Sequence, residues 1–131
     1  GTEERLIRQR IEEEKMEEFV LLLGKRSNPY PYIKECDLYV QPSRYEGKAV
    51  TVREAQILHK PVVITEFATA FSQLKNEYDG IIAPIDNQGC AEKIVELLKD
   101  EKYMRRLAEN TYKVDYSNRY EVEKIYHMIE E

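Results

Sequence analysis

Three consecutive β-branched residues, Val62, Val63 and Ile64, constrain the fold of this chain more than any other feature of its sequence. Successive side chains of a strand point to opposite faces of its sheet, so an unbroken apolar run predicts a strand that is covered on both faces. Parallel sheets are covered in this way, because the helices that connect their strands pack on both sides. Pro61 ends the helix expected before this run, which therefore predicts a parallel α/β domain.

Helix and strand patterns alternate along the rest of the chain, as in α/β domains with a mostly parallel sheet. The apolar spacing predicts strands at 19–23, 38–41, 62–64 and 81–83. Helices are predicted at 2–18, 32–36, 48–59 and 87–98, with further helical patterns at 104–111 and 122–129 and one helical turn within the loop 65–73. Two helical faces are expected to meet the core: Leu6, Ile7 and Ile11 in the first helix, and Ala91, Ile94, Val95 and Leu98 in the helix capped by Asp86 or Asn87.

The composition fits a single domain and excludes several classes of protein. The chain has 131 residues, of which 42% are hydrophobic, and a formal net charge of −5. This charge argues against a protein that mainly coats nucleic acid or an anionic membrane. The longest apolar runs fall well short of the roughly 18 residues of a membrane span. We therefore expect a cytoplasmic protein without a membrane span in this chain, in which Cys36 and Cys90 are buried, reduced thiols.

Glu54 is the residue that most suggests a ligand. In a helix that starts near Lys48, a rotation of about 100° per residue places Glu54 between the apolar Val50, Ile57 and Leu58. A carboxylate on an apolar face requires a hydrogen-bond donor, which we expect to be a basic side chain, a backbone amide or a ligand hydroxyl. The position of Glu54 therefore predicts a binding site beside this helix.

Gly47 marks the start of the same helix, directly after the strand 38–41 and the turn that contains Glu46. Ligands of parallel α/β sheets bind outside the carboxyl ends of the strands, where the next helix offers free backbone amides and a partial positive charge. A diphosphate could approach the amides of residues 47–50, namely Gly47, Lys48, Ala49 and Val50, with Lys48 adding a cation. Glu54 lies about 9 Å farther along the axis at about 1.5 Å per residue, a separation that suits the ribose of a nucleotide.

Lys25 and Arg26, in the loop after the strand 19–23, are further candidates for contacts with the phosphates or the base, although such residues are often simply exposed. Tyr30 and Tyr32 could stack on a base, but we expect them to be packing residues.

The segment from Gln41 to Thr65 resembles the signature of the family 4 (group 1) glycosyltransferases of GT-B architecture. Its matching features are the turn Pro42-Ser43-Arg44-Tyr45-Glu46-Gly47, the helix with Glu54, and Lys60-Pro61 before the buried strand. The resemblance extends over 78–84 and the helix that ends at Leu98, and more loosely over nearly the whole chain. The chain is most similar in this respect to bacterial enzymes that build capsular or exported polysaccharides. Where relatives often have Gly after the central helix, this chain has His59, which we expect to be structural.

This resemblance implies that residues 1–131 form a single Rossmann-like, three-layer domain that binds a nucleotide-diphosphate sugar as donor substrate. Glu54 would hold the ribose hydroxyls, Glu46 would act catalytically near the donor sugar, and Lys25 and Arg26 would bind the nucleotide. The resemblance implies transfer with retention, without a metal or other cofactor. An N-terminal domain, which we expect upstream of Gly1, would bring the saccharide or lipid-linked acceptor. The full-length protein would be cytoplasmic or peripheral to the inner face of the membrane.

Two alternatives remain open from the sequence. The same architecture is found in epimerases and phosphorylases that act on sugar phosphates. A noncatalytic α/β module that binds a protein partner would also fit the acidic composition, but it would leave Glu54 unexplained.

Overall fold

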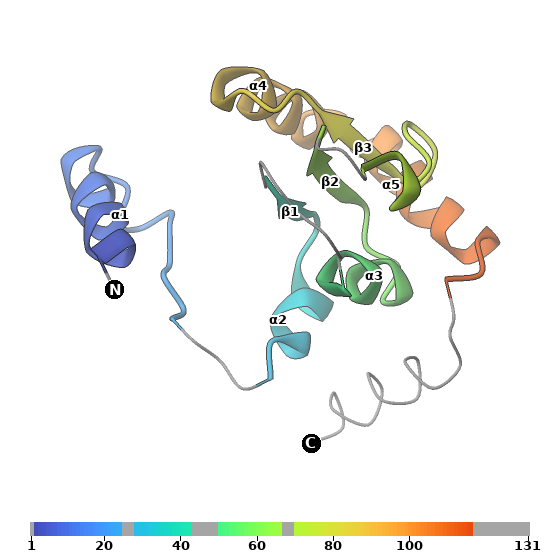
Figure 1. Ribbon diagram of the computed structural model, residues 1–131, viewed down its shortest axis with the longest axis horizontal. Coiled ribbons are helices and arrows are strands. Elements are labelled where there is room, and N and C mark those ends of the chain that lie inside the picture. Colours follow the sequence, from blue (N-terminus) through green and yellow to red (C-terminus); the bar gives the residue numbers. More distant parts are fainter. Residues whose placement is uncertain (1, 25–27, 43–49, 67–69, 117–131) are drawn as a thin grey trace.

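The computed structural model describes residues 2–24, 28–42, 50–66 and 70–116, which form a three-stranded parallel sheet with helices on both sides (Figure 1). The strands are β1 (Tyr39–Gln41), β2 (Val62–Thr65) and β3 (Gly80–Ala83). The helices are α1 (Thr2–Glu13), α2 (Tyr30–Glu35), α3 (Val50–Ile57), α4 (Asn87–Leu98) and α5 (Glu101–Asn110), with the 3₁₀ turns η1 (Ala70–Ser72) and η2 (Thr111–Lys113). The predicted α/β class with a parallel sheet is confirmed.

The β2 strand is the centre of the sheet, whose strand order is β1-β2-β3. Val62 pairs with Tyr39 on one side and with Gly80 on the other, and both pairings are parallel. The side chains of Val62, Val63 and Ile64 are all 0% exposed. The β-branched run is therefore covered on both faces, as its sequence predicts.

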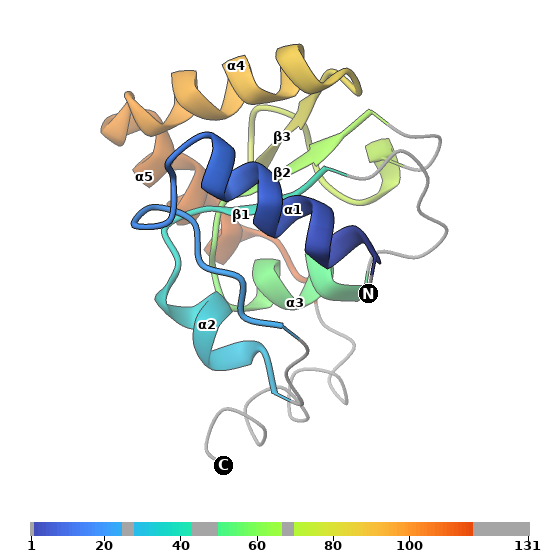
Figure 2. The same ribbon diagram turned by 90° about the vertical axis from the view of Figure 1, so that its left-hand side faces the viewer.

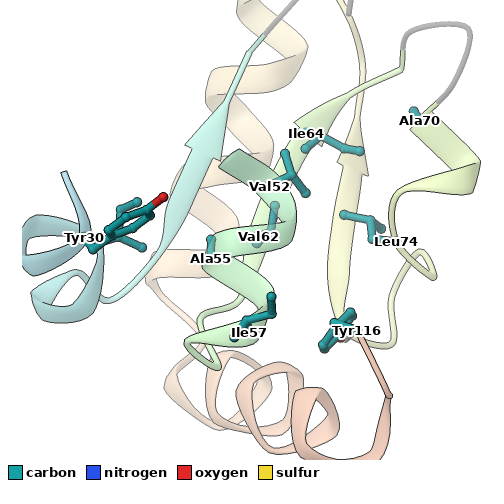
Figure 3. Close-up of a cluster of buried hydrophobic side chains, with 10 residues drawn as sticks. Tyr30, Val52, Ala55, Ile57, Val62, Ile64, Ala70, Leu74 and Tyr116 are labelled. Atoms are coloured by element: carbon teal, nitrogen blue, oxygen red, sulfur yellow. The ribbon is translucent and has the colours of Figure 1, made fainter. Parts of the chain in front are cut away.

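Two hydrophobic cores lie on opposite faces of the sheet. The first, here called the α3 core, contains Val62 and Ile64 from β2 together with buried residues of α2, α3 and η1 (Figure 3). The second, the α4 core, contains Val63 and buried residues of β3, α4 and α5. Alternate residues of β2 thus enter different cores, which gives the three-layer arrangement of helices, sheet and helices.

Gly80 allows β3 to lie close to β2. A Cβ atom on Gly80 would lie 2.5 Å from the backbone oxygen of Val62 and 2.8 Å from a methyl carbon of Leu74. Any larger residue would therefore push the central strands apart or displace Leu74. This contact explains the glycine at the first position of β3.

The predicted core face of α4 is largely wrong. Val95 and Leu98 are 48% and 55% exposed and Ala91 is exposed, whereas Cys90 and Leu97 are buried. Only Ile94 of the predicted face packs against the α4 core. The apolar residues of α4 lie on more than one side of the helix, and contact with the sheet and α5 determines which side is buried. The predicted cap is confirmed, because the Asp86 carboxylate accepts a hydrogen bond of 2.7 Å from the Gly89 amide.

The N-terminal predictions also fail in part. The segment 19–23 forms no strand, and Phe19 and Leu21 are 75% and 80% exposed. An apolar run becomes a strand only when another strand satisfies its backbone groups, and the three-stranded sheet does not include this segment. The α1 helix, set apart from the sheet in Figure 1 and seen in front of it in Figure 2, ends at Glu13 rather than residue 18 and leaves Leu6 and Ile7 exposed.

The remaining elements lie close to their predicted places. The α2 helix begins two residues earlier than predicted, and η1 is the single helical turn expected in the loop 65–73. Cys36 and Cys90 are free thiols, as predicted, although only Cys90 is fully buried. The predicted helix at 122–129 lies outside the described residues.

The adjacent leucines of α4 provide a test of the observed helix orientation. Leu97→Ala leaves a cavity in the α4 core and should lower the free energy of unfolding by about 2–5 kcal/mol. Leu98→Ala removes a mostly exposed side chain and should change it by less than about 0.5 kcal/mol. Urea denaturation of both variants measures the difference, and equal losses would contradict the orientation described above.

Candidate functional site

The carboxyl ends of the three parallel strands, at Gln41, Thr65 and Ala83, lie at the same edge of the sheet. The chain after β1 leads to α3, which begins at Val50. The chain after β3 leads to α4 through its cap at Asp86. This is the edge at which α/β domains bind ligands, because the helices that follow the strands begin there.

Glu54 lies in the second turn of α3, on the side that faces α2. Its neighbour Ala55 and nearby Val52 are 0% exposed, whereas the Glu54 side chain is partly exposed. The Tyr30 hydroxyl donates a hydrogen bond of 2.7 Å to Glu54 Oε1. The carboxylate therefore borders the α3 core, as the sequence predicts, and does not extend into bulk solvent.

Tyr30 is the first residue of α2 and projects from this helix into the α3 core (Figure 3). Only 6% of its surface is exposed. Burial, followed by the hydrogen bond and the negative charge of Glu54, raises the pKa of Tyr30 to about 12. The hydroxyl therefore keeps its proton at neutral pH and acts as the donor to the carboxylate.

The expected donors beside Glu54 were a basic side chain, a backbone amide or a ligand hydroxyl. The Tyr30 hydroxyl is a donor of another kind, which the sequence pattern did not predict. Tyr30 is the packing residue predicted from the sequence, whereas Tyr32 is 44% exposed. The two partners are separated by 24 residues, and only the packing of α2 beside α3 brings them together. A carboxylate on an apolar face indicated the need for a donor but not its identity.

The other predicted site residues are mostly outside the described part of the chain. These are Lys25, Arg26, Glu46, Gly47, Lys48 and Ala49. Val50 is the first residue of α3 within the described part of the chain, and the predicted helix start at Lys48 lies outside it. The contacts predicted between these site residues and a nucleotide sugar remain predictions.

His59 has a structural role in the described residues, as expected. Its φ angle of 63° lies in the left-handed region that favours glycine. The ring stacks on Tyr112 with centroids 3.6 Å apart, and Nδ1 lies 3.1 Å from the Thr111 hydroxyl oxygen. Burial lowers the pKa of His59. The end of α3 is thereby attached to the segment that follows α5.

A second tyrosine–carboxylate pair lies elsewhere in the fold. Asp79 is only 2% exposed and accepts hydrogen bonds from the Lys75 amide at 2.8 Å and the Tyr116 hydroxyl at 2.6 Å. Burial and the Asp79 carboxylate raise the pKa of Tyr116. The Arg53 guanidinium carbon lies 5.4 Å from the centre of the Tyr116 ring. Both Asp79 oxygens are bonded inside the protein, so this pair joins the turn before β3 to the chain after α5.

Comparison with known proteins places these features in a family. The pattern of the family described as glycosyl transferases group 1 matches residues 1–114. An N-acetylgalactosaminyltransferase of Campylobacter jejuni, named for the substrate N,N'-diacetylbacillosaminyl-diphospho-undecaprenol, is 38% identical over 89 residues. The match covers 67% of this chain and 24% of the relative. The capsular polysaccharide biosynthesis glycosyltransferase CapM of Staphylococcus aureus is 30% identical over 92 residues, covering 70% of this chain and 24% of CapM.

Solved structures show the same fold. The protein HepE of Anabaena, whose structure contains UDP, superposes with a TM-score of 0.78 at 25% identity, over 96% of this chain and 35% of HepE. Sucrose-phosphate synthase of Thermosynechococcus elongatus superposes with a TM-score of 0.73 at 25% identity, over 95% of this chain and 30% of that protein. The present chain therefore spans about a third or less of these proteins. Within its described residues, the structure has no helix with the length and apolarity that crossing a bilayer requires.

The two bonded tyrosines predict how stability depends on alkaline pH. Unfolded tyrosines ionise near their ordinary pKa of 10, whereas Tyr30 in the folded protein keeps its proton to about pH 12 and the pKa of Tyr116 is also raised. The unfolded state therefore loses protons first, and the free energy of unfolding should fall as pH rises from about 10 towards 12. Below pH 10 neither residue should contribute to a slope.

Denaturant titrations of the wild type, Tyr30→Phe and Tyr116→Phe between pH 9 and pH 12 measure this effect. Each variant should show a shallower decline than the wild type because one shifted group is removed. Tyr112→Phe, at a residue that is 71% exposed, is the control and should keep the wild-type slope. Unchanged slopes in both buried-tyrosine variants would refute the assignment.

Proposed function

The chain belongs to the group 1 glycosyl transferase family, and on this premise we propose that it is the donor-binding domain of a retaining glycosyltransferase of GT-B architecture. In this proposal the whole enzyme moves a sugar from a nucleotide-diphosphate sugar to a saccharide or lipid-linked acceptor. The names of the relatives support this acceptor class, since the Campylobacter enzyme is named for an undecaprenol diphosphate substrate and CapM for capsular polysaccharide. The UDP in the HepE structure supports a nucleotide donor.

The single observation that carries the proposal is the placement of Glu54. Its carboxylate lies beside an apolar core, in a helix that follows the carboxyl end of β1, and is partly exposed. A carboxylate in such surroundings binds hydroxyl donors strongly, because they compensate for the water it has lost. We assign the vicinal hydroxyls of the donor ribose to Glu54.

The diphosphate would then lie at the start of α3. We propose that the amides of Gly47, Lys48, Ala49 and Val50 bind it together with the Lys48 cation, and that Lys25 and Arg26 contact the nucleotide. The α3 helix contributes the partial positive charge of its N-terminus, which stabilises the negative charge that develops on the leaving diphosphate. The proposal assigns this role to the chain's own groups rather than to a metal ion. Glu46, in the turn before the helix, would lie near the donor sugar.

The acceptor would be bound by another part of the whole protein. This chain spans 24% of the Campylobacter and Staphylococcus relatives, so a domain that binds acceptor is expected from the remainder. We therefore propose that the chain alone binds nucleotide weakly and transfers no sugar. The same proposal places the whole protein in the cytoplasm or at the inner face of the membrane.

Calorimetric titration with UDP and GDP tests the proposed function. The wild-type chain should bind at least one of them, and Glu54→Ala should weaken binding by roughly 1.5–3 kcal/mol, the range for a hydrogen bond to a charged group. Glu92→Ala, at an exposed position on α4, is a control that should bind as the wild type does.

Failure of the wild type to bind either nucleotide would overturn the proposal and favour a noncatalytic partner-binding module. Equal affinities of the wild type and Glu54→Ala would refute the role of Glu54. Sugar transfer by the isolated chain from a UDP-linked or GDP-linked sugar would refute its expected inactivity.

A further inference from the structure

We propose that Tyr30 is a positioning residue, which orients the Glu54 carboxylate so that it can bind the ribose hydroxyls of the donor nucleotide. This inference rests on the proposed function, because it assumes that Glu54 binds ribose. It adds a residue from a different helix, whose hydroxyl donates to Glu54 Oε1 at 2.7 Å.

Tyr30 is held in place by groups other than Glu54. Its backbone amide donates to Asn28 Oδ1 at 3.2 Å, which fixes the first turn of α2. Its ring is buried in the α3 core, in the same cluster as Ile33 of α2 and Val52 and Ala55 of α3 (Figure 3). The hydroxyl therefore occupies a defined position before any ligand arrives.

This rigidity matters because a glutamate side chain is flexible. An unrestrained glutamate loses rotational freedom when it binds a ligand, and that loss reduces affinity. A hydrogen bond from a fixed hydroxyl restrains Glu54 Oε1 in advance and compensates part of its lost hydration. A carboxylate can accept several hydrogen bonds, so the bond from Tyr30 is compatible with simultaneous bonds from ribose hydroxyls.

The Tyr116–Asp79 pair shows what an entirely internal version of this contact looks like. Asp79 is 2% exposed and both of its oxygens accept hydrogen bonds from described groups, so it is closed to a ligand. Glu54 is partly exposed and lies in the helix that begins at the ligand-binding edge. The two pairs share the same chemistry, but only Glu54 is placed to contact a nucleotide. Tyr116 is therefore a matched internal control for Tyr30.

The test compares the binding of UDP and 2′-deoxy-UDP to the whole 131-residue chain by calorimetry. The wild type should prefer UDP, because Glu54 accepts from the 2′-hydroxyl. Tyr30→Phe should weaken UDP binding about tenfold, or about 1.4 kcal/mol, and should weaken 2′-deoxy-UDP less, because that ligand keeps only the 3′-hydroxyl for Glu54, so that the preference for UDP shrinks. Tyr116→Phe should lower the melting temperature but keep the wild-type preference. A purely structural role for Tyr30 would weaken both ligands equally.

Two further variants keep the proposal falsifiable. Tyr30→Met fills the same part of the core without a hydroxyl and should reduce the preference as Tyr30→Phe does, so it decides the case if Tyr30→Phe does not fold. In a Glu54→Ala background, Tyr30→Phe should cause no further loss of preference, because the positioned group is absent.

The outcomes separate this inference from the proposed function. A folded Tyr30 variant that keeps the full preference for UDP would overturn the role of Tyr30 alone. So would a wild type that binds UDP and 2′-deoxy-UDP with equal affinity. A wild type that binds neither nucleotide would overturn the proposed function, and the inference with it.

Discussion

The rest of the structure depends on the complete removal of β2 from water. The three β-branched residues at its centre are fully buried, and parallel neighbours on both sides pair with its backbone groups. Each face of this strand requires a layer of helices, so α2 and α3 cover one side and α4 and α5 cover the other. The direction of the strands then places the helices that follow them, α3 and α4, at one edge, which is where the candidate site lies.

At the candidate site, the apolar core lies beside a charged group, the Glu54 carboxylate. A carboxylate beside an apolar core is costly unless its hydrogen bonds are supplied, and in this fold the first is supplied by a tyrosine from another helix. Asp79 avoids this cost because both of its carboxylate oxygens accept hydrogen bonds from groups inside the protein. Asp79 is thus closed to the outside, whereas Glu54 is partly exposed, and this difference in exposure is the basis of the ligand-binding role that we propose for Glu54.

Much of this arrangement could be predicted from the sequence. The run Val62-Val63-Ile64 predicts its own burial because only a covered strand accommodates it, and Glu54 was recognisable because a charge interrupts an apolar face. The sequence pattern favours Leu98 over Leu97 as the buried residue, because Leu98 shares a helical face with other apolar residues, but the neighbouring sheet and α5 bury Leu97 instead. The segment 19–23 has the composition of a strand, but composition does not supply the neighbouring strand that its backbone requires. Tyr30 was predicted only as packing, because its bond to Glu54 arises from the way two helices meet.

The chain after α5 connects the two sides of the sheet. Leu107 of α5 belongs to the α4 core, while Tyr116, a few residues later, belongs to the α3 core. Between them, Thr111 and Tyr112 hold the left-handed turn at His59, and Tyr116 then reaches Asp79. The segment between α5 and Tyr116 therefore contacts both hydrophobic cores. If one core loosens, the contacts of this segment with the other core are disturbed as well. Because this segment links the two cores, we expect them to unfold together in one cooperative transition rather than separately.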